Sequence, residues 1–284
     1  MKILVTGYTG QLGYDIVHQG LQLGLNMVGI GSKDIDITNK EAVFQYVNKV
    51  KPEAIIHCAA YTAVDKAEDD KDTCQHVNVN GTNNLAEAAK EINAKFMYIS
   101  TDYVFSGEGQ TPFKESDETS PIGHYGRTKL EGEEVVKKLL NKWFIIRISW
   151  VFGINGNNFV KTMLRLGETR DELNVVGDQV GSPTYTSDLA KLLIEMIKTD
   201  KYGIYHASNE GFCSWADFAQ EIFRQANIKV KVNSISTEEY PTRAVRPKNS
   251  RMSKQKLIDN GFKPLPKWQD SVERYLKQLT QEVK

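Results

Sequence analysis

The sequence is poor in cysteine, and the few that it has exclude two kinds of site. Its 284 residues include three cysteines, Cys58, Cys74 and Cys213, which lie far apart in the chain. This odd number and wide spacing fit neither a disulfide framework nor a zinc site, and they favour a reducing, cytoplasmic location. Cys58 ends an apolar run, so we expect it to be a buried thiol.

The chain also lacks an excess of charge of either sign. Lys and Arg total 36, Asp and Glu total 36, and the formal net charge at pH 7 is zero. This balance gives no electrostatic reason to expect nucleic acid or an anionic membrane surface as a partner. It still leaves room for a local cationic pocket that binds a phosphorylated small molecule.

Long hydrophobic runs, low-complexity tracts and internal repeats are missing too. The N-terminal run, MKILVTG, is too short for a signal peptide, and no later run reaches the roughly 20 apolar residues of a membrane span. Hydrophobic residues make up 40% of the chain and charged residues 25%, as in ordinary globular proteins. We therefore expect one large α/β domain, or one with a smaller appendage, and no membrane partner.

The first half of the sequence alternates between short apolar runs and segments with helical periodicity. Strands are predicted at 2–6, 26–30, 53–58, 95–100 and 143–149, and helices at 10–24, 39–50, 73–92 and 124–141. Strands separated by helices indicate βαβ units with right-handed crossovers. The predicted fold class is therefore α/β, with a Rossmann-type, doubly wound parallel sheet.

This regularity falls after about residue 150. Helices are predicted at 157–168, 186–198, 214–227 and 268–282, and short strands at 174–176, 203–207 and 229–235. We assign residues 1–150 to the Rossmann domain, which would bind NAD(P). Residues 151–284 form mainly a smaller substrate-binding lobe that returns in part to the same sheet.

A glycine-rich segment, TGYTGQLG, joins the first predicted strand to the first predicted helix. Gly7, Gly10 and Gly13 are spaced G-x-x-G-x-x-G. Glycines allow a tight turn and a close approach of the backbone to a pyrophosphate, and the helix N-terminus attracts the anion. Three glycines can also serve a simple turn, but their position between a strand and a helix favours a dinucleotide-binding loop.

The end of the second predicted strand bears on which dinucleotide is bound. An acidic residue that holds the ribose 2′-hydroxyl is usual there, whereas here Gly31 is followed by Ser32 and Lys33. A hydroxyl and an ammonium suit a 2′-phosphate better, so we predict NADPH, with NADH tolerated. The alternative is a polar loop that contacts nothing. Asp36 and Ile37 could border the adenine instead.

Of the twelve tyrosines, only Tyr125 has a lysine four positions later, Lys129. On a helix the two side chains share a face, and a nearby ammonium is expected to lower the pKa of the phenol towards the working pH. Thr101 lies at the carboxyl end of the fourth predicted strand, where open parallel sheets bind ligands. Its hydroxyl could hydrogen-bond a substrate carbonyl. Chance Tyr-x-x-x-Lys pairs are common, so this pair carries weight only in its context.

The glycine loop, the strand-end threonine and Tyr-x-x-x-Lys, in this order, resemble the extended short-chain dehydrogenase/reductase superfamily. Within it, segments along the whole chain look like those of the dTDP-4-dehydrorhamnose reductase family, which makes dTDP-L-rhamnose for bacterial cell-surface polysaccharides. These segments are AAYTAVDKAE (59–68), STDYVF (100–105), YGRTKLEGE (125–133), RISWVFG (147–153), NNFVKTML (157–164), DQVGSPT (178–184) and RPKNSRM (246–252). The resemblance implies NADPH-dependent reduction of the C4 ketone of dTDP-4-dehydro-L-rhamnose.

The resemblance also implies catalytic roles for single residues. Tyr125 would supply the proton, Lys129 would hold the nicotinamide ribose, and Thr101 would polarise the ketone. With the strand-end residues above, the predicted cofactor contacts are Gly7, Thr9, Gly10, Gln11, Leu12, Gly13, Ser32, Lys33, Asp36, Ile37, Ala59, Ala60, Tyr61, Thr62, Ser100, Tyr125 and Lys129. The implied substrate contacts are Thr101, Asp102, Tyr103, Trp150, Asn158 and Arg246. A core position is the alternative for Trp150, and a surface salt bridge is the alternative for Arg246.

One position separates the chain from related enzymes. In related nucleotide-sugar dehydratases the catalytic threonine is followed by Asp and Glu, whereas here it is followed by Asp102 and Tyr103. A tyrosine cannot replace the second carboxylate as a base, which favours simple reduction. Two alternatives stay open. One is a reductase of a different nucleotide-4-ketosugar. The other is a non-catalytic, dinucleotide-binding regulatory subunit like that of methionine adenosyltransferase.

The chain departs from the family at a metal site. Some members are dimers with a magnesium ion held between glutamates, but the matching region here carries Asp15, with Asp188 in a later segment. We therefore predict no metal, and either a monomer or a homodimer. His57 and His124 match no catalytic position of the family, so we expect a packed histidine and a helix-start residue.

Overall fold

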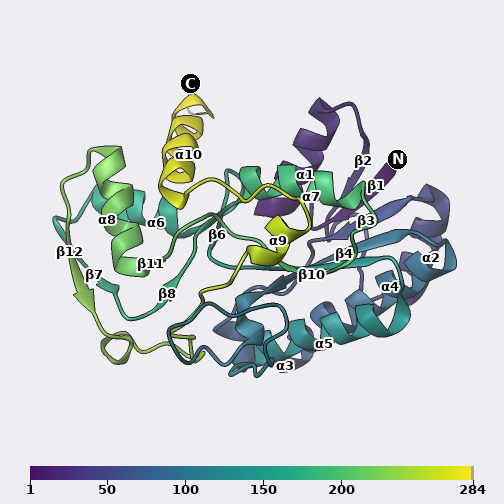
Figure 1. Cartoon of the computed structure of the whole chain (residues 1–284), viewed down its shortest axis with the longest axis horizontal. Helices are drawn as coiled ribbons and strands as arrows, with labels where there is room; N and C mark the ends of the chain where they lie inside the picture. Colours follow the sequence, from purple (N-terminus) through teal and green to yellow (C-terminus); the bar gives the residue numbers. More distant parts are fainter. Residues whose placement is uncertain (283–284) are drawn as a thin grey trace.

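A computed structural model of the chain describes residues 1–282. Its centre is a six-stranded sheet with the strand order β2-β1-β3-β4-β5-β10, and every pairing in it is parallel (Figure 1). The strands are β1 (Lys2–Thr6), β2 (Asn26–Ile30), β3 (Ala54–His57), β4 (Lys95–Thr101), β5 (Trp143–Ile148) and β10 (Gly203–His206). The predicted α/β class with a doubly wound parallel sheet is confirmed.

Helices cover both faces of this sheet. One face carries α1 (Gln11–Gln22) and α7 (Thr186–Ile197), and the other carries α2 (Lys40–Val50), α4 (Thr82–Glu91) and α5 (His124–Leu139). Successive residues of each strand point to opposite faces, so Ile55 packs under α4 while Ile56 packs under α1. Both layers are apolar, which explains why the strands read as continuous hydrophobic runs.

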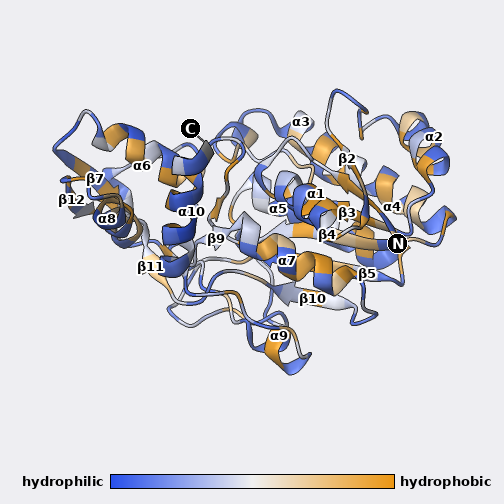
Figure 2. Cartoon of the chain, turned by 90° about the horizontal axis from the view of Figure 1, so that it is seen from above, coloured by the Kyte–Doolittle hydropathy of each residue, from blue (hydrophilic) through white to orange (hydrophobic). Residues whose placement is uncertain are grey.

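Each covering helix presents an apolar side to the sheet and a polar side to solvent, and Figure 2 accordingly shows hydrophobic and hydrophilic residues on the same helix. Of the helices in the described part of the chain, none combines the length and the apolar character that a bilayer span requires.

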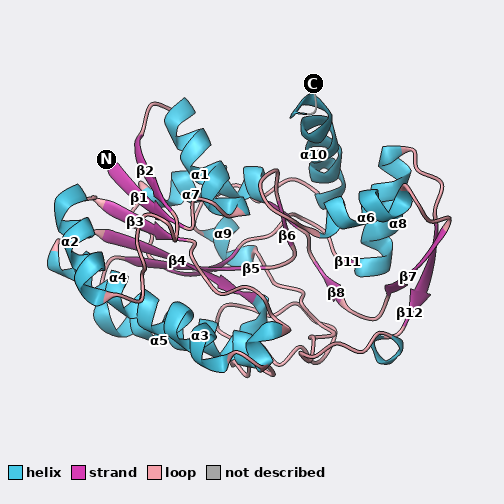
Figure 3. Cartoon of the chain, turned by 180° about the vertical axis from the view of Figure 1, so that it is seen from behind, coloured by secondary structure: helices cyan, strands magenta, loops and turns pink. Residues whose placement is uncertain are grey.

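The second half of the chain contributes β10 to the sheet and α7 to one of its faces, and otherwise builds a separate packing unit beside it. It contains α6 (Phe159–Gly167), α8 (Trp215–Ala226), α10 (Trp268–Glu282) and the parallel pair β7 (Glu172–Val176) with β12 (Lys231–Ile235), on the side away from β2 (Figure 3). Shorter elements connect these, namely β6 (Val151–Phe152), β8 (Val180–Gly181), β9 (Thr184–Tyr185), β11 (Cys213–Ser214) and α9 (Gln255–Asp259). We call this unit the lobe. Its core is aromatic, with Phe152, Phe218 and Tyr275 buried together.

The prediction of one helix over 73–92 is wrong in detail. The chain forms α3 (Lys71–Gln75), then a π-helical segment η2 (His76–Gly81), and then α4. Asn78 explains the interruption, because its buried side chain accepts a hydrogen bond from Tyr61 N at 2.8 Å and donates to Thr128 Oγ1 at 3.0 Å. A wider turn allows both contacts, and such turns are common near functional sites.

The expectations for the two histidines hold. His57 is fully buried between Thr6 Oγ1 at 2.7 Å and Thr82 Oγ1 at 3.0 Å, and burial lowers its pKa to about 3. His124 is the first residue of α5. Cys58 is only partly buried, since it lies at the cavity described below, whereas Cys74 and Cys213 are buried.

A buried ion pair fixes α5 against β4 and β5. Arg147 Nε and Nη2 donate to the two carboxylate oxygens of Glu133 at 2.9 and 2.7 Å, and the two side chains are 2% and 0% exposed. Ser100 Oγ donates to the same carboxylate at 2.5 Å. Since α5 carries Tyr125 and Lys129 and β4 ends at Thr101, this network sets the helix at a fixed position relative to the strand ends.

Removing one charge of this pair should destabilise the fold. Glu133→Ala leaves the Arg147 guanidinium buried without its carboxylate, so we expect the free energy of unfolding to fall by roughly 3–5 kcal/mol. The neighbouring Glu134 is 62% exposed and pairs with Lys137 at the surface, so Glu134→Ala should change it by about 0.5 kcal/mol or less. Urea denaturation at neutral pH compares the two variants. Equal losses would show that the buried pair does not hold α5 in place.

Candidate active site

A cavity of about 820 Å³ opens where the parallel strands end. It spans the reversal of strand order between β1 and β3, which is where open α/β sheets bind their ligands. Most of the predicted site residues line it: Gly7, Thr9, Gly10, Gln11, Leu12, Gly13, Ser32, Asp36, Ile37, Ala59, Ala60, Thr62, Ser100, Thr101, Asp102, Tyr103, Tyr125, Lys129 and Trp150. Residues that are far apart in the sequence thus meet in one space.

The remaining predicted residues lie outside this lining. Lys33 borders an adjoining hollow of about 450 Å³, which shares Ser32 with the cavity. Tyr61 donates through its hydroxyl to Asp70 at 3.3 Å. Arg246 does not line the cavity but donates to the hydroxyl of Tyr103, which does, at 3.2 Å. Asn158 does not line the cavity but donates through Nδ2 to Gln11 Oε1 at 3.1 Å. Their roles in binding stay predictions.

The glycine loop lies against the end of β3 more closely than a side chain permits. Gly7 has φ +69°, and a Cβ there would lie 2.7 Å from Ala59 N. A Cβ on Gly13 would lie 2.3 Å from Gly7 O. No side chain caps the first turn of α1 and no acidic residue stands in it. The positive end of the helix dipole is therefore free to attract a phosphate in the cavity.

Thr101, Tyr125 and Lys129 all line this cavity, Thr101 and Lys129 as buried residues and Tyr125 as a half-buried one. Thr101 Oγ1 donates to Asp102 Oδ1 at 3.0 Å and accepts from Tyr103 N at 3.2 Å. The Tyr125 ring packs edge-on against Tyr103 with centroids 5.7 Å apart. The Lys129 ammonium lies 4.0 Å from the centre of the Tyr98 ring, and its side chain is 2% exposed.

The expectation that Lys129 lowers the pKa of Tyr125 is wrong. Burial and the carboxylate of Asp102 raise the pKa of Tyr125 well above its ordinary value, and a hydrogen bond with Thr101 offsets only part of this. Burial also lowers the pKa of Lys129 to about 7. Its ammonium packs on Tyr98, and among the residues described here it makes no hydrogen bond to Tyr125. Desolvation therefore outweighs the attraction between the two groups, and Tyr125 stays a protonated phenol at neutral pH.

Trp150 forms a rigid wall of the cavity. Its backbone adopts φ +48°, an uncommon conformation for a bulky residue. Its indole stacks on Trp215 of α8 with centroids 3.7 Å apart and an angle of 14° between the rings. Sequence reasoning missed Trp215, because it has no motif and reaches the site only through the packing of the lobe.

The arginine-rich segment 243–251 bonds to acidic residues in the first half of the chain. Arg246 Nη2 donates to Asp65 Oδ2 at 2.7 Å, and Arg243 Nη2 donates to Asp69 Oδ1 at 2.6 Å. Ala244 N adds a bond to Asp65 Oδ1 at 3.1 Å. These contacts connect segment 243–251 to residues 65–69, which include the short 3₁₀ helix η1 (Lys66–Glu68), and Arg246 also bonds to Tyr103 of the cavity wall.

Comparison with known proteins gives one consistent family. The model of the RmlD substrate binding domain matches residues 1–281. A dTDP-4-dehydrorhamnose reductase from Aggregatibacter actinomycetemcomitans is 44% identical in an alignment that covers 90% of this chain and 92% of that protein.

Two solved structures are similar over the whole chain. One is a dTDP-4-dehydrorhamnose reductase from Clostridium acetobutylicum, with a TM-score of 0.96, 46% identity and coverage of 99% of this chain and 100% of that one. The other is a dTDP-4-dehydrorhamnose reductase from Bacillus anthracis in complex with NADP, with a TM-score of 0.95, 45% identity and coverage of 98% and 100%.

The Asp102 carboxyl should make stability depend on pH in a measurable way. Asp102 is 4% exposed, and burial raises its pKa from 3.8 to about 6, although hydrogen bonds from Ser250 and Thr101 oppose the rise. The folded state therefore holds this proton more tightly than the unfolded state does. The stabilisation that this tighter proton binding gives to the fold is complete below the pKa of Asp102 in the unfolded state. It is lost as the pH rises through the pKa of Asp102 in the folded state.

We expect Asp102→Asn to remove that loss. The quantity to compare is the free energy of unfolding of the variant minus that of wild type. It should be roughly 2–3 kcal/mol larger at about pH 7 than at about pH 4. Urea denaturation of both proteins at the two pH values measures the gain. The same difference at both pH values would show that Asp102 titrates at its ordinary pKa.

Proposed function

We propose residue roles on one premise: the chain belongs to the family of the RmlD substrate binding domain, which spans residues 1–281. The resemblance inferred from the motifs is confirmed. The protein is an NADPH-dependent oxidoreductase that reduces the C4 ketone of dTDP-4-dehydrorhamnose and so gives dTDP-L-rhamnose. The observation that carries this function is the whole-chain match to reductases of 40–44% identity. The gathering of Thr101, Tyr125 and Lys129 in one cavity is consistent with it.

The residues of the cavity fit a dinucleotide. The glycine loop offers a cradle that a Cβ at Gly7 or Gly13 would fill, and the uncapped start of α1 faces the same space. We assign Gly10 to Leu12 to the pyrophosphate and Ala59 to Thr62 to the ribose side. Ser32 lines the cavity and Lys33 borders the adjoining hollow, so the pair is placed to receive a 2′-phosphate at the boundary between the two. When bound, NADPH supplies the hydride.

Tyr125 suits the role of proton donor. An ordinary tyrosine is already protonated at neutral pH, and burial raises the pKa of Tyr125 further, so a proton is present when charge develops on the ketone oxygen. An alkoxide is far more basic than a phenolate, and the transfer therefore runs downhill. With the bound cofactor supplying the hydride to C4, the phenol O–H bond of Tyr125 would break and its proton would complete the new hydroxyl. Thr101 stands beside it as a second hydrogen-bonding group for the same oxygen.

Lys129 and Asp102 set the charge of the site. The pKa of Lys129 near 7 means that the ammonium is easily gained or lost at neutral pH. A phenolate formed on Tyr125 attracts this cation, and a ribose diol can use its donors. Asp102, Tyr103 and Trp150 also line the cavity, and we place the sugar against them. Asp15 and Asp188 are paired within the protein, with Thr186 Oγ1 at 2.5 Å and with the Arg274 guanidinium. We propose a monomer or homodimer that needs no metal there.

Tyr125→Phe tests the proton donor. The change removes only the hydroxyl, so we expect kcat to fall by roughly 100- to 10,000-fold while the Kd for NADPH changes by less than about threefold. The assay follows loss of NADPH absorbance with dTDP-4-dehydro-L-rhamnose made in situ. Tyr202→Phe is the matched control, because its hydroxyl donates to Asp200 at 2.7 Å and Tyr202 does not line the cavity. Near-normal turnover by Tyr125→Phe would remove Tyr125 from the reaction.

Lys33→Ala tests the choice of cofactor. If the ammonium meets the 2′-phosphate, the Kd for NADPH should rise about tenfold, which corresponds to one exposed charge-assisted hydrogen bond. The Kd for NADH should stay unchanged, because NADH has no phosphate at that position. Calorimetric titration of wild type and Lys33→Ala with NADPH and with NADH measures these Kd values. An equal loss for the two would show that Lys33 does not contact the phosphate.

A further inference from the structure

The side-chain amide of Gln11 is held in one orientation at the cavity. Gln11 is the first residue of α1 and lines the cavity beside the glycine loop. Its oxygen Oε1 accepts from Gly153 N at 2.9 Å and from Asn158 Nδ2 at 3.1 Å. Because both partners are donors, this end of the amide must be the oxygen. Its nitrogen bonds to none of the residues in the described range, so both of its N–H groups are available to a ligand in the cavity.

Asn158 has its polar atoms engaged on several sides. Its Oδ1 accepts from Lys161 N at 3.0 Å and caps the N-terminus of α6. Its Nδ2 donates to Gln11 and also to Gly153 O at 2.8 Å. Asn158 does not line the cavity. This placement supports a role that acts through Gln11, in place of the direct substrate contact that its motif implies.

Tyr275 supports Asn158 from the C-terminal helix. The Tyr275 hydroxyl lies 3.0 Å from Asn158 Nδ2 and donates to Gly153 O at 3.1 Å, and the side chain is fully buried. A second link runs parallel to it, since Asn155 Nδ2 donates to Thr9 O at 2.8 Å. The loop of residues 153–158 thus connects α10 to the glycine loop.

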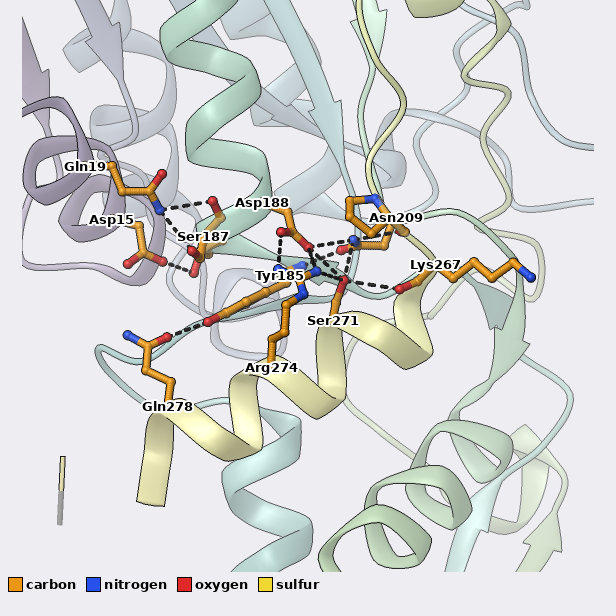
Figure 4. A network of polar contacts seen from close by, with 12 residues as sticks. Asp15, Gln19, Tyr185, Ser187, Asp188, Asn209, Lys267, Ser271, Arg274 and Gln278 are labelled. Carbon is orange, nitrogen blue, oxygen red and sulfur yellow. Dashed lines mark hydrogen bonds and ion pairs between the residues drawn. The ribbon is translucent and has the colours of Figure 1, made fainter. Parts of the chain in front are cut away.

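The position of α10 is fixed independently of Asn158. Arg274, next to Tyr275, donates to Asp188 Oδ1 and Oδ2 at 2.5 and 2.7 Å, and Ser271 Oγ donates to the same carboxylate at 2.7 Å (Figure 4). Asp188 is 4% exposed and belongs to α7. The first residue of α7, Thr186, bonds in turn to Asp15 of α1. The helix that carries Tyr275 is therefore anchored to the same helix that begins at Gln11.

From this geometry we propose that Asn158 and Tyr275 are positioning residues that direct the Gln11 amide nitrogen towards the pyrophosphate of the cofactor. The inference rests on the proposed function, because it takes the ligand of the glycine loop to be a dinucleotide. An N–H donor attracts a phosphate oxygen, whereas the amide oxygen in its place repels it. Without Asn158 the amide loses one of the two donors that fix its orientation and turns its oxygen to the phosphate in part of the molecules.

Asn158→Asp isolates this effect. Aspartate keeps the acceptor that caps α6 but has no N–H to give, and its oxygen repels Gln11 Oε1 and favours the flipped amide. We expect the Kd for NADPH to rise about tenfold and the Kd for 2′-AMP, which has no pyrophosphate, to stay unchanged. Tyr275→Phe, which removes only the hydroxyl, should weaken NADPH in the same direction. Asn141→Asp at the exposed position 141 controls for added charge.

A double-mutant cycle gives the decisive measurement. In a Gln11→Ala background the change Asn158→Asp should cause no further loss of NADPH affinity, because the group that it orients is gone. The same loss in both backgrounds, or an equal loss for 2′-AMP, would overturn the inference and make Asn158 a general structural residue. Unchanged NADPH affinity in Asn158→Asp, with normal binding by wild type, would overturn the inference alone. Wild type that binds no NADPH would overturn the proposed function as well.

Discussion

The close approach of the glycine loop to the end of β3 is the constraint on which the site depends. Gly7 and Gly13 leave no room for a side chain, so the loop and the start of α1 lie directly against each other and against the end of β3. That starting point aims the helix dipole into the cavity and places Gln11 at its edge. On the other side of the sheet, the Glu133–Arg147 pair places α5 with the same rigidity. The cofactor loop and the catalytic helix are thus set against the strands by different physical means, steric contact in one case and a buried charge pair in the other.

Burial, more than charge, sets the chemistry of the cavity. Desolvation raises the pKa of Tyr125, lowers that of Lys129 to about 7 and raises that of Asp102 to about 6. Each shift favours the uncharged form of the group. A protonated phenol and a carboxyl that is readily protonated suit a site that must deliver a proton to a developing alkoxide. The neutral forms also limit the charge that the apolar cavity has to hold before a ligand enters.

The sequence was sufficient for the fold because its signals are local. The apolar runs at 2–6 and 26–30 match β1 and β2. The glycine loop, Thr101 and Tyr-x-x-x-Lys predict the strand ends and the helix that meet at the cavity. It was insufficient wherever a long-range contact decides. Asn78 widens a helix through its bond to Tyr61, Trp215 supports Trp150, and Asn158 reaches Gln11 across 147 positions. The pKa of Tyr125 was misjudged for the same reason, because spacing shows a neighbouring charge but not the depth of burial.

The contacts between residues 1–150 and the rest of the chain have a consequence for how such chains diversify. Gln11 with Asn158, Asp15 with Thr186, and Asp65 with Arg246 each join one half to the other through paired polar groups. The halves are therefore not interchangeable modules. A recombinant that takes its first 150 residues from one relative and the rest from another inherits mismatched partners at the seam unless both parents share these pairs. Variation in the sugar pocket is consequently expected to accumulate by point changes at the residues that line it, and exchange of whole segments is expected to be rare.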